Sequence, residues 1–374
     1  TGSANLLEDL PLRCTVQPLK QPPAYSLVDP DPPPEDQRAR FRIDLIGYRR
    51  QNQFLRRVQL GLQQAEHRAP AFAAYLEAIN RQQAVAWRIN RPLLEKVRGL
   101  IGLVQGAEDQ DPALVADLSG LDAPARAALR GWVRDQLFRP VPSGERKAMV
   151  RPGEFLDSPL ARRALAELCP AAGEQPPFYL PWKADYRGRI YAETPWLSPQ
   201  GGDLQRALLE FARGQVLNAA GVQALRRHGA NLVRRERLLA DLGISDRQVV
   251  TLAEREGWVV AHEREILASA AAPGATPFWR EVASKPMQFL AFCLAYRQWR
   301  LDPAAVVHLP VQIDGTCNGL QHIAALTGDA GLARAVNVLP RDDGLPGDIY
   351  SELATAAAAA LGQLGGKPDK LHGP

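Results

Sequence analysis

The sequence predicts an α+β fold that is mostly helical, and three observations indicate it. Apolar residues recur at helical spacing over several long stretches, a pattern typical of helices packed on a common core. Two shorter stretches, within 176–215 and at 309–314, combine the alternation of strands with a turn and a helix that follow. The 374 residues, 46% of them hydrophobic, can bury a substantial core and form more than one domain.

The N-terminal region combines a proline-rich segment with a basic one. Residues 16–36 are predicted to form an extended connector because proline is frequent there. Residues 37–57 interleave arginines with Phe41, Tyr48 and Phe54. This composition fits nucleic-acid binding and a helix with a solvated basic face equally well.

Helices are expected next, over 71–105, 112–139 and 155–169. In the first of these segments the helical spacing is carried by Phe72, Tyr75, Leu76 and Ile79, and the apolar pattern continues through Val85, Trp87 and Ile89. In the second, Trp132, Leu137 and Phe138 are expected to be core residues rather than ligand contacts.

Residues 176–215 are predicted to form a strand, a turn and a helix. Within a strand, Arg187, Arg189 and Tyr191 lie on one face. Two guanidinium groups and an aromatic ring suit a sugar–phosphate backbone, because arginine makes forked hydrogen bonds to phosphate oxygens. A solvated basic strand that pairs with Asp185 and Glu193 is the alternative.

Asp203 is predicted to cap the helix of this segment. The apolar residues of that helix repeat at helical spacing and are Leu204, Ala207, Leu208 and Phe211. Arg213 and Gly214 are predicted to end it, as a cation and a glycine after the last turn.

Residues 219–300 are predicted to be largely helical, with Leu290, Phe292, Leu294 and Tyr296 as core candidates. Positive charge concentrates in this region at Arg226, Arg227, Arg234, Arg235 and Arg237. The last three are candidate phosphate contacts, and a solvated helix face is the alternative. A later alanine-rich run, 354–361, is predicted to be a helix because alanine has the highest helix propensity.

The most informative stretch is 309–322. Alternation of apolar and polar residues predicts a strand that ends at Asp314, followed by Gly315 and a helix that Asn318 caps. Gly315 permits a close approach. A carboxylate at a strand end beside a glycine suits a hard cation such as Mg²⁺. The alternative is an ordinary turn in which the aspartate only accepts local hydrogen bonds.

Several classes of protein are not supported. The four cysteines lie far apart in the sequence, which indicates reduced thiols rather than a zinc site or a disulfide framework. The sequence contains neither a phosphate-binding P-loop pattern nor a signal peptide nor an apolar run that could span a membrane. A net charge of +4 is a weak argument for nucleic acid, so local clusters matter more.

Taken together, the segments around Arg187 and Asp314 resemble the single-subunit, bacteriophage-type RNA polymerases, the family that also includes the mitochondrial enzymes. The similar pieces occur in the family's order from about residue 75 to about residue 350. They are 78–80, 86–90, 185–191, 198–201, 228–231, 288–293, 314–322, 334–340 and 348–350. Any one piece is weak, whereas the ordered set is specific.

The resemblance implies a right-hand polymerase fold cut just after its first palm aspartate motif. It assigns 1–105 to the end of an N-terminal domain with the proline-rich connector, and 106–175 to thumb-like helices. It assigns 176–330 to the first part of the palm with a helical insertion, and 331–374 to the start of the fingers. The similarity is weakest in the thumb, which is short.

The resemblance also implies template-directed transfer of ribonucleotides by two Mg²⁺ ions. Asp314 matches the family's first metal-binding, catalytic aspartate, and the Gly315 carbonyl is the neighbouring metal ligand. Arg187 and Arg189, with Tyr191, correspond to contacts along the template–product hybrid. The partners implied are a DNA template, an RNA product and ribonucleoside triphosphates, with no membrane, and a monomer is expected.

Three residues near this turn are interpreted as structural: Cys317, Gln321 and His322. His322 has the side chain of a general base, but an imidazole that bonds to nearby backbone is the preferred interpretation. Cys317 is likewise interpreted as a packing residue rather than a nucleophile.

Other parts that the family needs are not in the sequence. A His-Asp-Ser turn with the second catalytic aspartate is absent, as is the fingers helix with its lysine and tyrosine. The chain opens with Thr1 and is interpreted as a piece of a longer protein that is inactive alone. The cytoplasm of a bacterial host or phage-infected cell is the expected location, with a mitochondrial origin left open.

Two alternatives remain from the sequence. A DNA polymerase of related palm architecture usually has Tyr-Ser after its aspartate, whereas Gly315 and Thr316 follow Asp314 here. A remnant that binds nucleic acid without catalysis is the other alternative, and the sequence downstream of this chain distinguishes it from an enzyme.

Overall fold

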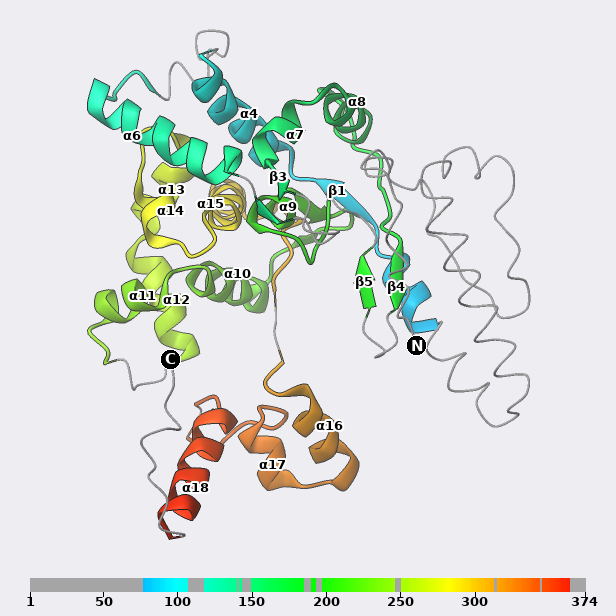
Figure 1. Cartoon of the computed structure of the whole chain (residues 1–374), viewed down its shortest axis with the longest axis vertical. Coiled ribbons are helices and arrows are strands. Elements are labelled where there is room, and N and C mark those ends of the chain that lie inside the picture. Colours follow the sequence, from blue (N-terminus) through cyan, green and yellow to red (C-terminus); the bar gives the residue numbers. More distant parts are fainter. Residues whose placement is uncertain are drawn as a thin grey trace.

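The computed structural model describes nine stretches of the chain: 77–106, 118–139, 141–142, 149–184, 190–192, 197–245, 250–312, 315–343 and 345–363. Helices dominate these residues and strands are short, as Figure 1 shows. The α+β, mostly helical prediction is confirmed. Among the described helices, none combines the length and apolarity that a bilayer crossing requires.

The first half of the described chain alternates short strands with helices. Its elements are β1 (Trp87–Ile89), α4 (Arg91–Gln105), α6 (Ala123–Val133), the π-helical turn η3 (Arg134–Phe138), β2 (Val141–Pro142), β3 (Met149–Val150), α7 (Pro152–Asp157), α8 (Pro159–Leu168), β4 (Trp182–Ala184) and β5 (Ile190–Ala192). The expected core residues of 112–139 are confirmed: Leu137 is buried, and Trp132 and Phe138 pack against the core.

The second half is more helical. Its elements are α9 (Asp203–Ala207), β6 (Leu209–Phe211), β7 (Gln215–Val216), α10 (Ala219–Asn231), α11 (Arg235–Leu242), α12 (Leu252–Ala261), α13 (Glu263–Ala271), α14 (Phe278–Val282), α15 (Pro286–Leu301), β8 (Val306–Val307), α16 (Asn318–Thr327), α17 (Ala330–Ala335) and α18 (Ile349–Gln363). The described strands form antiparallel pairs: β1 with β6, β2 with β3, β4 with β5, and β7 with β8.

The β1–β6 pair corrects two sequence predictions. A continuous helix over 71–105 is wrong at β1, where Trp87 donates its N–H to the Phe178 carbonyl at 2.8 Å and its ring stacks on Phe211. A helix from Asp203 to residue 213 is also wrong, because α9 ends at Ala207 and β6 follows. Each strand is stabilised by a partner more than 100 residues away, and local spacing does not reveal such partners.

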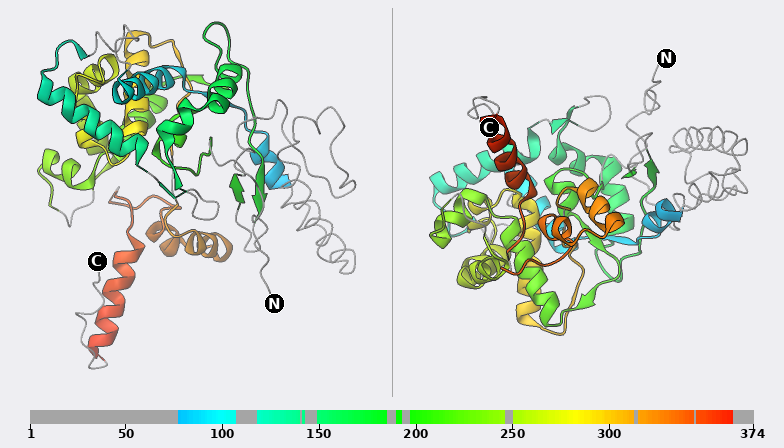
Figure 2. Two further views of the ribbon diagram at one scale, coloured as in Figure 1. Left: turned by 45° about the horizontal axis from the view of Figure 1, so that its top comes forward. Right: turned by 90° about the horizontal axis from the view of Figure 1, so that it is seen from below.

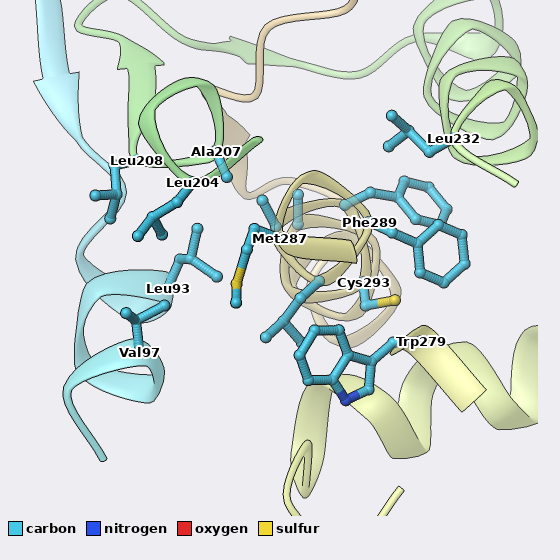
Figure 3. Packing of buried hydrophobic residues seen from close by; sticks show 14 of the residues in the cluster. Leu93, Val97, Leu204, Ala207, Leu208, Leu232, Trp279, Met287, Phe289 and Cys293 are labelled. Atoms are coloured by element: carbon cyan, nitrogen blue, oxygen red, sulfur yellow. The ribbon is translucent and has the colours of Figure 1, made fainter. Parts of the chain in front are cut away.

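The core centres on α15, whose side chains are buried on nearly every side. Its buried residues are Met287, Gln288, Phe289, Leu290, Ala291, Phe292, Cys293, Ala295, Tyr296 and Trp299. Figure 3 shows side chains of α4, α9 and α14 gathered around it. The predicted core residues Leu290, Phe292 and Tyr296 are confirmed, and Leu294 is half-buried against the same cluster.

Asp203 caps α15 rather than its own helix. Its carboxylate accepts hydrogen bonds from the Met287 N–H at 2.8 Å, the Gln288 N–H at 3.1 Å and the Gln288 side-chain amide at 3.0 Å. These bonds satisfy N–H groups that the first turn of a helix leaves unpaired. Gly202 occupies the cap position of α9, so the sequence prediction chose the right residue type and the wrong helix.

Helix α10 approaches α15 closely at Gly229. A Cβ atom at this position would overlap the Phe292 ring, 2.6 Å from Cε1. Glycine is therefore required by packing and not by backbone conformation. The predicted helical character of 219–300 is confirmed over the described residues of that range.

Helices α16, α17 and α18 form a second, smaller unit. Their buried residues, Ala324, Ala333, Val336 and Ile349, make a cluster separate from the main core. Figures 1 and 2 show these helices set apart from the other described elements. The predicted helix at 354–361 is confirmed as part of α18.

Replacing Gly229 by alanine tests the close contact between α10 and α15. We expect Gly229→Ala to lower the free energy of unfolding by about 1–3 kcal/mol, because the added methyl group displaces the buried Phe292 ring. Urea unfolding followed by far-UV circular dichroism measures the change.

Gly257→Ala is the matched control, since Gly257 is exposed in α12 and a Cβ there would meet nothing within 4 Å. This substitution should raise stability by about 1 kcal/mol through helix propensity alone. Equal effects of the two substitutions would contradict the packing explanation.

Candidate functional site

The segment that leads to Asp314 follows β8 of the main body, by which we mean the described elements before α16. Asp314 and Ile313 lie outside the described residues, whereas Gln312 and Gly315 on either side of them are described. The predicted strand over 309–314 is wrong in its described part, because 309–312 adopts no strand and the strand β8 lies earlier. Pro310 has no N–H for a sheet hydrogen bond, which explains why strand pairing ends before it.

His308 is the last point at which this segment bonds to the sheet. Its carbonyl accepts from the Phe211 N–H at 3.0 Å, and its ring Nδ1 bonds to the Phe211 carbonyl at 2.8 Å. The His308 ring also packs on Gly214, where a Cβ would lie 2.8 Å from ring carbons. Burial lowers the pKa of His308, and the nearby charge of Arg88 lowers it further. The ring therefore acts here as a neutral packing group.

Arg206 of α9 links the main body to the residues just before Asp314. Its guanidinium donates a hydrogen bond to the side-chain oxygen of Gln312. Its Nε is buried without a hydrogen-bond partner among the described residues. The same charge lies near His228, which is 4% exposed. Burial, assisted by Arg206, lowers the pKa of His228 to about 4.

At the turn after Asp314, a Cβ at Gly315 would lie 2.7 Å from Asn318 Oδ1 and 3.2 Å from Gln321 Oε1, which are the ends of flexible side chains, and Gly315 itself is exposed. The expectation that this glycine permits a close approach stays a prediction. Asn318 is not the helix cap, which corrects the sequence prediction. Cys317 takes the cap position with a φ of 54°, in the left-handed region that non-glycine residues rarely adopt.

The three residues interpreted as structural, Cys317, Gln321 and His322, differ in their contacts and burial. Gln321 donates its side-chain N–H to the Val336 carbonyl at 2.8 Å, and Cys317 is half-buried against the α16–α18 cluster. His322 is exposed on α16. Within the described part of α16, the backbone contact expected of His322 is made by its neighbour Gln321.

The candidate nucleic-acid residues are only partly described. Tyr191 lies in β5, half-buried and in register with Lys183 of β4. Arg187 and Arg189 lie outside the described residues. Their expected position on the Tyr191 face therefore stays a prediction.

The arginine cluster splits into two groups. Arg226 lies over the Trp299 ring at 5.7 Å and Arg227 pairs with Glu256 at 2.6 Å, so both belong to the packing of α10. The other three residues are exposed on or next to α11: Arg234, Arg235 and Arg237.

All three residues of the exposed group interact with other protein groups. Arg237 pairs with Asp241 at 2.9 Å, and Arg234 donates to the Ala283 carbonyl at 3.2 Å. The third, Arg235, lies close enough to Asp348 to contribute to its lowered pKa, which hydrogen bonds from Ser351 lower most.

The comparisons with known proteins give a consistent result. Residues 215–366 match the family described as DNA-dependent RNA polymerase. The mitochondrial DNA-directed RNA polymerase of Mus musculus is 42% identical over 181 residues, 48% of this chain and 14% of that protein. The DNA-directed RNA polymerase of Enterobacteria phage T3 is 28% identical over 317 residues, 79% of this chain and 31% of that protein.

A third relative comes from plants. The chloroplastic and mitochondrial DNA-directed RNA polymerase 2 of Arabidopsis thaliana is 29% identical over 285 residues, 75% of this chain and 26% of that protein. The chain spans less than a third of the length of each of these relatives. It is thus related to polymerases that are themselves much longer.

The mostly helical α+β fold, together with these matches, indicates a relative of the nucleic-acid polymerases. More narrowly, the chain is similar to the phage-type DNA-directed RNA polymerases, and the similar proteins come from phage, mitochondria and chloroplasts. The family resemblance noted in the sequence is confirmed.

Of the two expected metal ligands, Gly315 lies within the described residues and Asp314 does not. Within the described ranges, no three His, Cys, Asp or Glu side chains gather into a group that could hold a metal ion. Asp314 lies outside those ranges, so the Mg²⁺ site stays a prediction.

The buried His228 predicts a dependence of stability on pH. Its pKa is about 4 in the folded chain and 6.5 in the reference state, so the unfolded chain takes up the proton first as pH falls. The contribution of neutral His228 to the free energy of unfolding is fully present above pH 6.5 and is lost as pH falls toward 4. The loss amounts to about 3 kcal/mol.

Urea unfolding from about pH 7 to about pH 4.5 measures this loss in the wild type and in His228→Gln, which cannot titrate. As pH falls over this range, we expect the free energy of unfolding of the wild type to decrease relative to that of His228→Gln by most of that amount. His322→Gln, at an exposed position on α16, is the control for the exchange of histidine for glutamine. A stability difference for His228→Gln that does not change with pH would show that the imidazole is not buried in its neutral form.

Proposed function

We propose that this chain takes part in template-directed synthesis of RNA by nucleotidyl transfer. The observation that supports the proposal most is the family match over 215–366, which includes the Asp314–Gly315 turn and the residues around it. The curated relatives reported above are named as DNA-directed RNA polymerases, whichever compartment they come from. The substrates proposed are ribonucleoside triphosphates and a DNA template, with RNA as the product.

Asp314 is proposed as the carboxylate that holds Mg²⁺, with the Gly315 carbonyl as its neighbour. Bound Mg²⁺ ions lower the barrier of nucleotidyl transfer by activating the attacking hydroxyl and neutralising the pyrophosphate. The role of the chain is to present the carboxylate without room for a larger residue beside it. The contacts of Asn318 and Gln321 above Gly315 support this role.

Basic residues are proposed to hold the nucleic acid. Arg187 and Arg189, with Tyr191, would contact the template–product hybrid, because forked hydrogen bonds suit phosphate oxygens. Arg234, Arg235 and Arg237, exposed on or next to α11, are the proposed phosphate contacts outside the hybrid. Arg237 competes with that role through its pair with Asp241.

The right-hand subdivision is proposed in the form that the sequence implied. The ranges are 1–105 for the end of the N-terminal domain, 106–175 for the thumb, 176–330 for the palm and 331–374 for the start of the fingers. The separate cluster of α16–α18 supports a boundary in this region. Since α16 packs with α17, the boundary that the packing favours precedes α16. A monomer in the cytoplasm is proposed as well.

The alternatives are less well supported. A DNA polymerase is not favoured, since the relatives are RNA polymerases and Gly315 and Thr316 follow the aspartate. A nucleic-acid-binding remnant without catalysis predicts that Asp314 has no chemical role, which the following experiment tests.

Asp314→Asn, made in the full-length polymerase, tests the catalytic proposal. We expect nucleotide addition to fall at least about a thousandfold, because the amide carries no charge for the metal ion. Template binding should stay within a few-fold of the wild type. Single-nucleotide extension of a preformed primer–template, together with a filter-binding titration, measures both quantities.

Asp342→Asn is the matched control, since Asp342 is exposed and the same charge is removed by the same substitution. It should extend the primer at the wild-type rate. Normal extension by Asp314→Asn would refute the assignment.

Arg187→Ala and Arg189→Ala test the hybrid contact. Each substitution removes contacts to phosphate, so short RNA products should dissociate earlier and the abortive fraction should rise several-fold. Gel analysis of run-off transcripts at two salt concentrations measures the fraction. Arg151→Ala, which breaks only an exposed pair with Glu154, is the control, and an unchanged abortive pattern in both variants would remove the proposal.

A further inference from the structure

Asn337 connects three parts of the C-terminal unit through one side chain. Its amide nitrogen donates to Thr316 Oγ1 at 3.0 Å and to the Gly347 carbonyl at 2.9 Å. Its amide oxygen accepts from the Gly347 N–H at 2.7 Å. We call Thr316, Asn337 and Gly347 the Asn337 bridge.

The backbone around Asn337 is built for this contact. Asn337 has a φ of 61°, a left-handed conformation that asparagine tolerates better than most residues. At the other side of the bridge, Gly347 is buried and leaves no room for a side chain. A Cβ there would lie 2.5 Å from the Ala335 carbonyl oxygen and 3.1 Å from that of Arg334.

A second contact supports the first from the neighbouring residue. Gln321 of α16 donates to the carbonyl of Val336, a fully buried residue next to Asn337. The side-chain oxygen of Gln321 also lies above Gly315. The segment at 336–337 therefore holds the turn 315–317 both directly, through Thr316, and indirectly, through Gln321.

On the N-terminal side of Asp314, Arg206 of α9 bonds to Gln312. On its C-terminal side, Thr316 bonds to Asn337 and Cys317 packs against the small cluster of α16–α18. The residues before and after Asp314 are thus held by different units.

We propose that Asn337 is a positioning residue that fixes the turn after Asp314 relative to α17 and α18. The proposal deepens the proposed function and rests on it for its catalytic consequence. Asn337 is not proposed to contact a reacting group; it acts through its hydrogen bond to Thr316. The orientation of the Gly315–Cys317 turn then follows any displacement of the C-terminal helices.

Four variants in the full-length polymerase separate the amide from the backbone. Asn337→Gly keeps the left-handed backbone and deletes the amide. Asn337→Asp keeps the acceptor for the Gly347 N–H and removes the N–H donors to Thr316 Oγ1 and to the Gly347 carbonyl. Thr316→Val deletes the hydroxyl acceptor at nearly constant shape, and Thr316→Ser is its matched control because it retains the hydroxyl.

Hydrogen exchange followed by mass spectrometry is the first readout. Thr316→Val should speed exchange of the peptide over 315–321 at least about threefold and leave the Gly347 amide unchanged, because only the first contact is lost. Asn337→Gly should speed exchange at both places. If Asn337→Gly alters only residues near Gly347, the role of Asn337 in positioning the turn is overturned.

Nucleotide addition is the second readout. Asn337→Asp and Thr316→Val should each slow single-nucleotide extension about fivefold to tenfold at saturating substrate, with unchanged template affinity. Because both remove the same hydrogen bond, the double variant should be no slower than the slower single variant. A double variant whose rate falls by the product of the two single effects would overturn the proposal. Thr316→Ser, which keeps the hydroxyl, should extend the primer at the wild-type rate.

The two readouts keep failure of this proposal distinct from failure of the proposed function. If Asp314→Asn extends primers normally, the catalytic assignment fails, while the exchange measurement still decides whether Asn337 holds the turn. If Asp314→Asn is inactive and the exchange of 315–321 is unchanged in Thr316→Val, the polymerase proposal stands and the positioning role is overturned.

Discussion

The capping of α15 by Asp203 is the interaction on which the rest of the described structure depends. α15 is buried on nearly every side, so the N–H groups of its first turn have no water to bond to. The Asp203 carboxylate supplies the acceptor from α9, although its own burial raises the pKa of that carboxyl. The same short helix carries Arg206, which reaches Gln312. One element thus fixes the central helix and faces the candidate site.

Much of the family resemblance consists of residues that build this core. Gly229 is a glycine because Phe292 occupies the space of its side chain, and His228 is held neutral by burial in the same helix. Gln288 bonds to the capping carboxylate. These positions read as motifs in the sequence, yet their contacts show that they serve packing and capping. The chemistry is concentrated in fewer positions than the motifs suggest.

Long helices were predictable from sequence, whereas strands of two or three residues were not. The periodic apolar residues of 219–300 are fixed locally by their own helices, so spacing was sufficient. By contrast, Trp87 and Phe211 pair across more than 100 residues, and strand β8 ends at Val307, before the segment that spacing alone predicted as a strand. For the site, the sequence pattern drew attention to Asp314 and Gly315, of which only Gly315 lies within the described residues. The role of Asn337 was missed because its partners become neighbours only after folding.

The position of Asp314 between two differently anchored segments has a physical consequence. Metal geometry tolerates errors of only a few tenths of an ångström, so a carboxylate ligand requires support on both sides. Here Arg206 anchors the preceding residues to the main core, and Asn337 anchors the following turn to the small cluster of α16–α18. Under the proposed metal role of Asp314, the placement of this ligand depends on both units, whereas a site supported by one core would depend on that core alone.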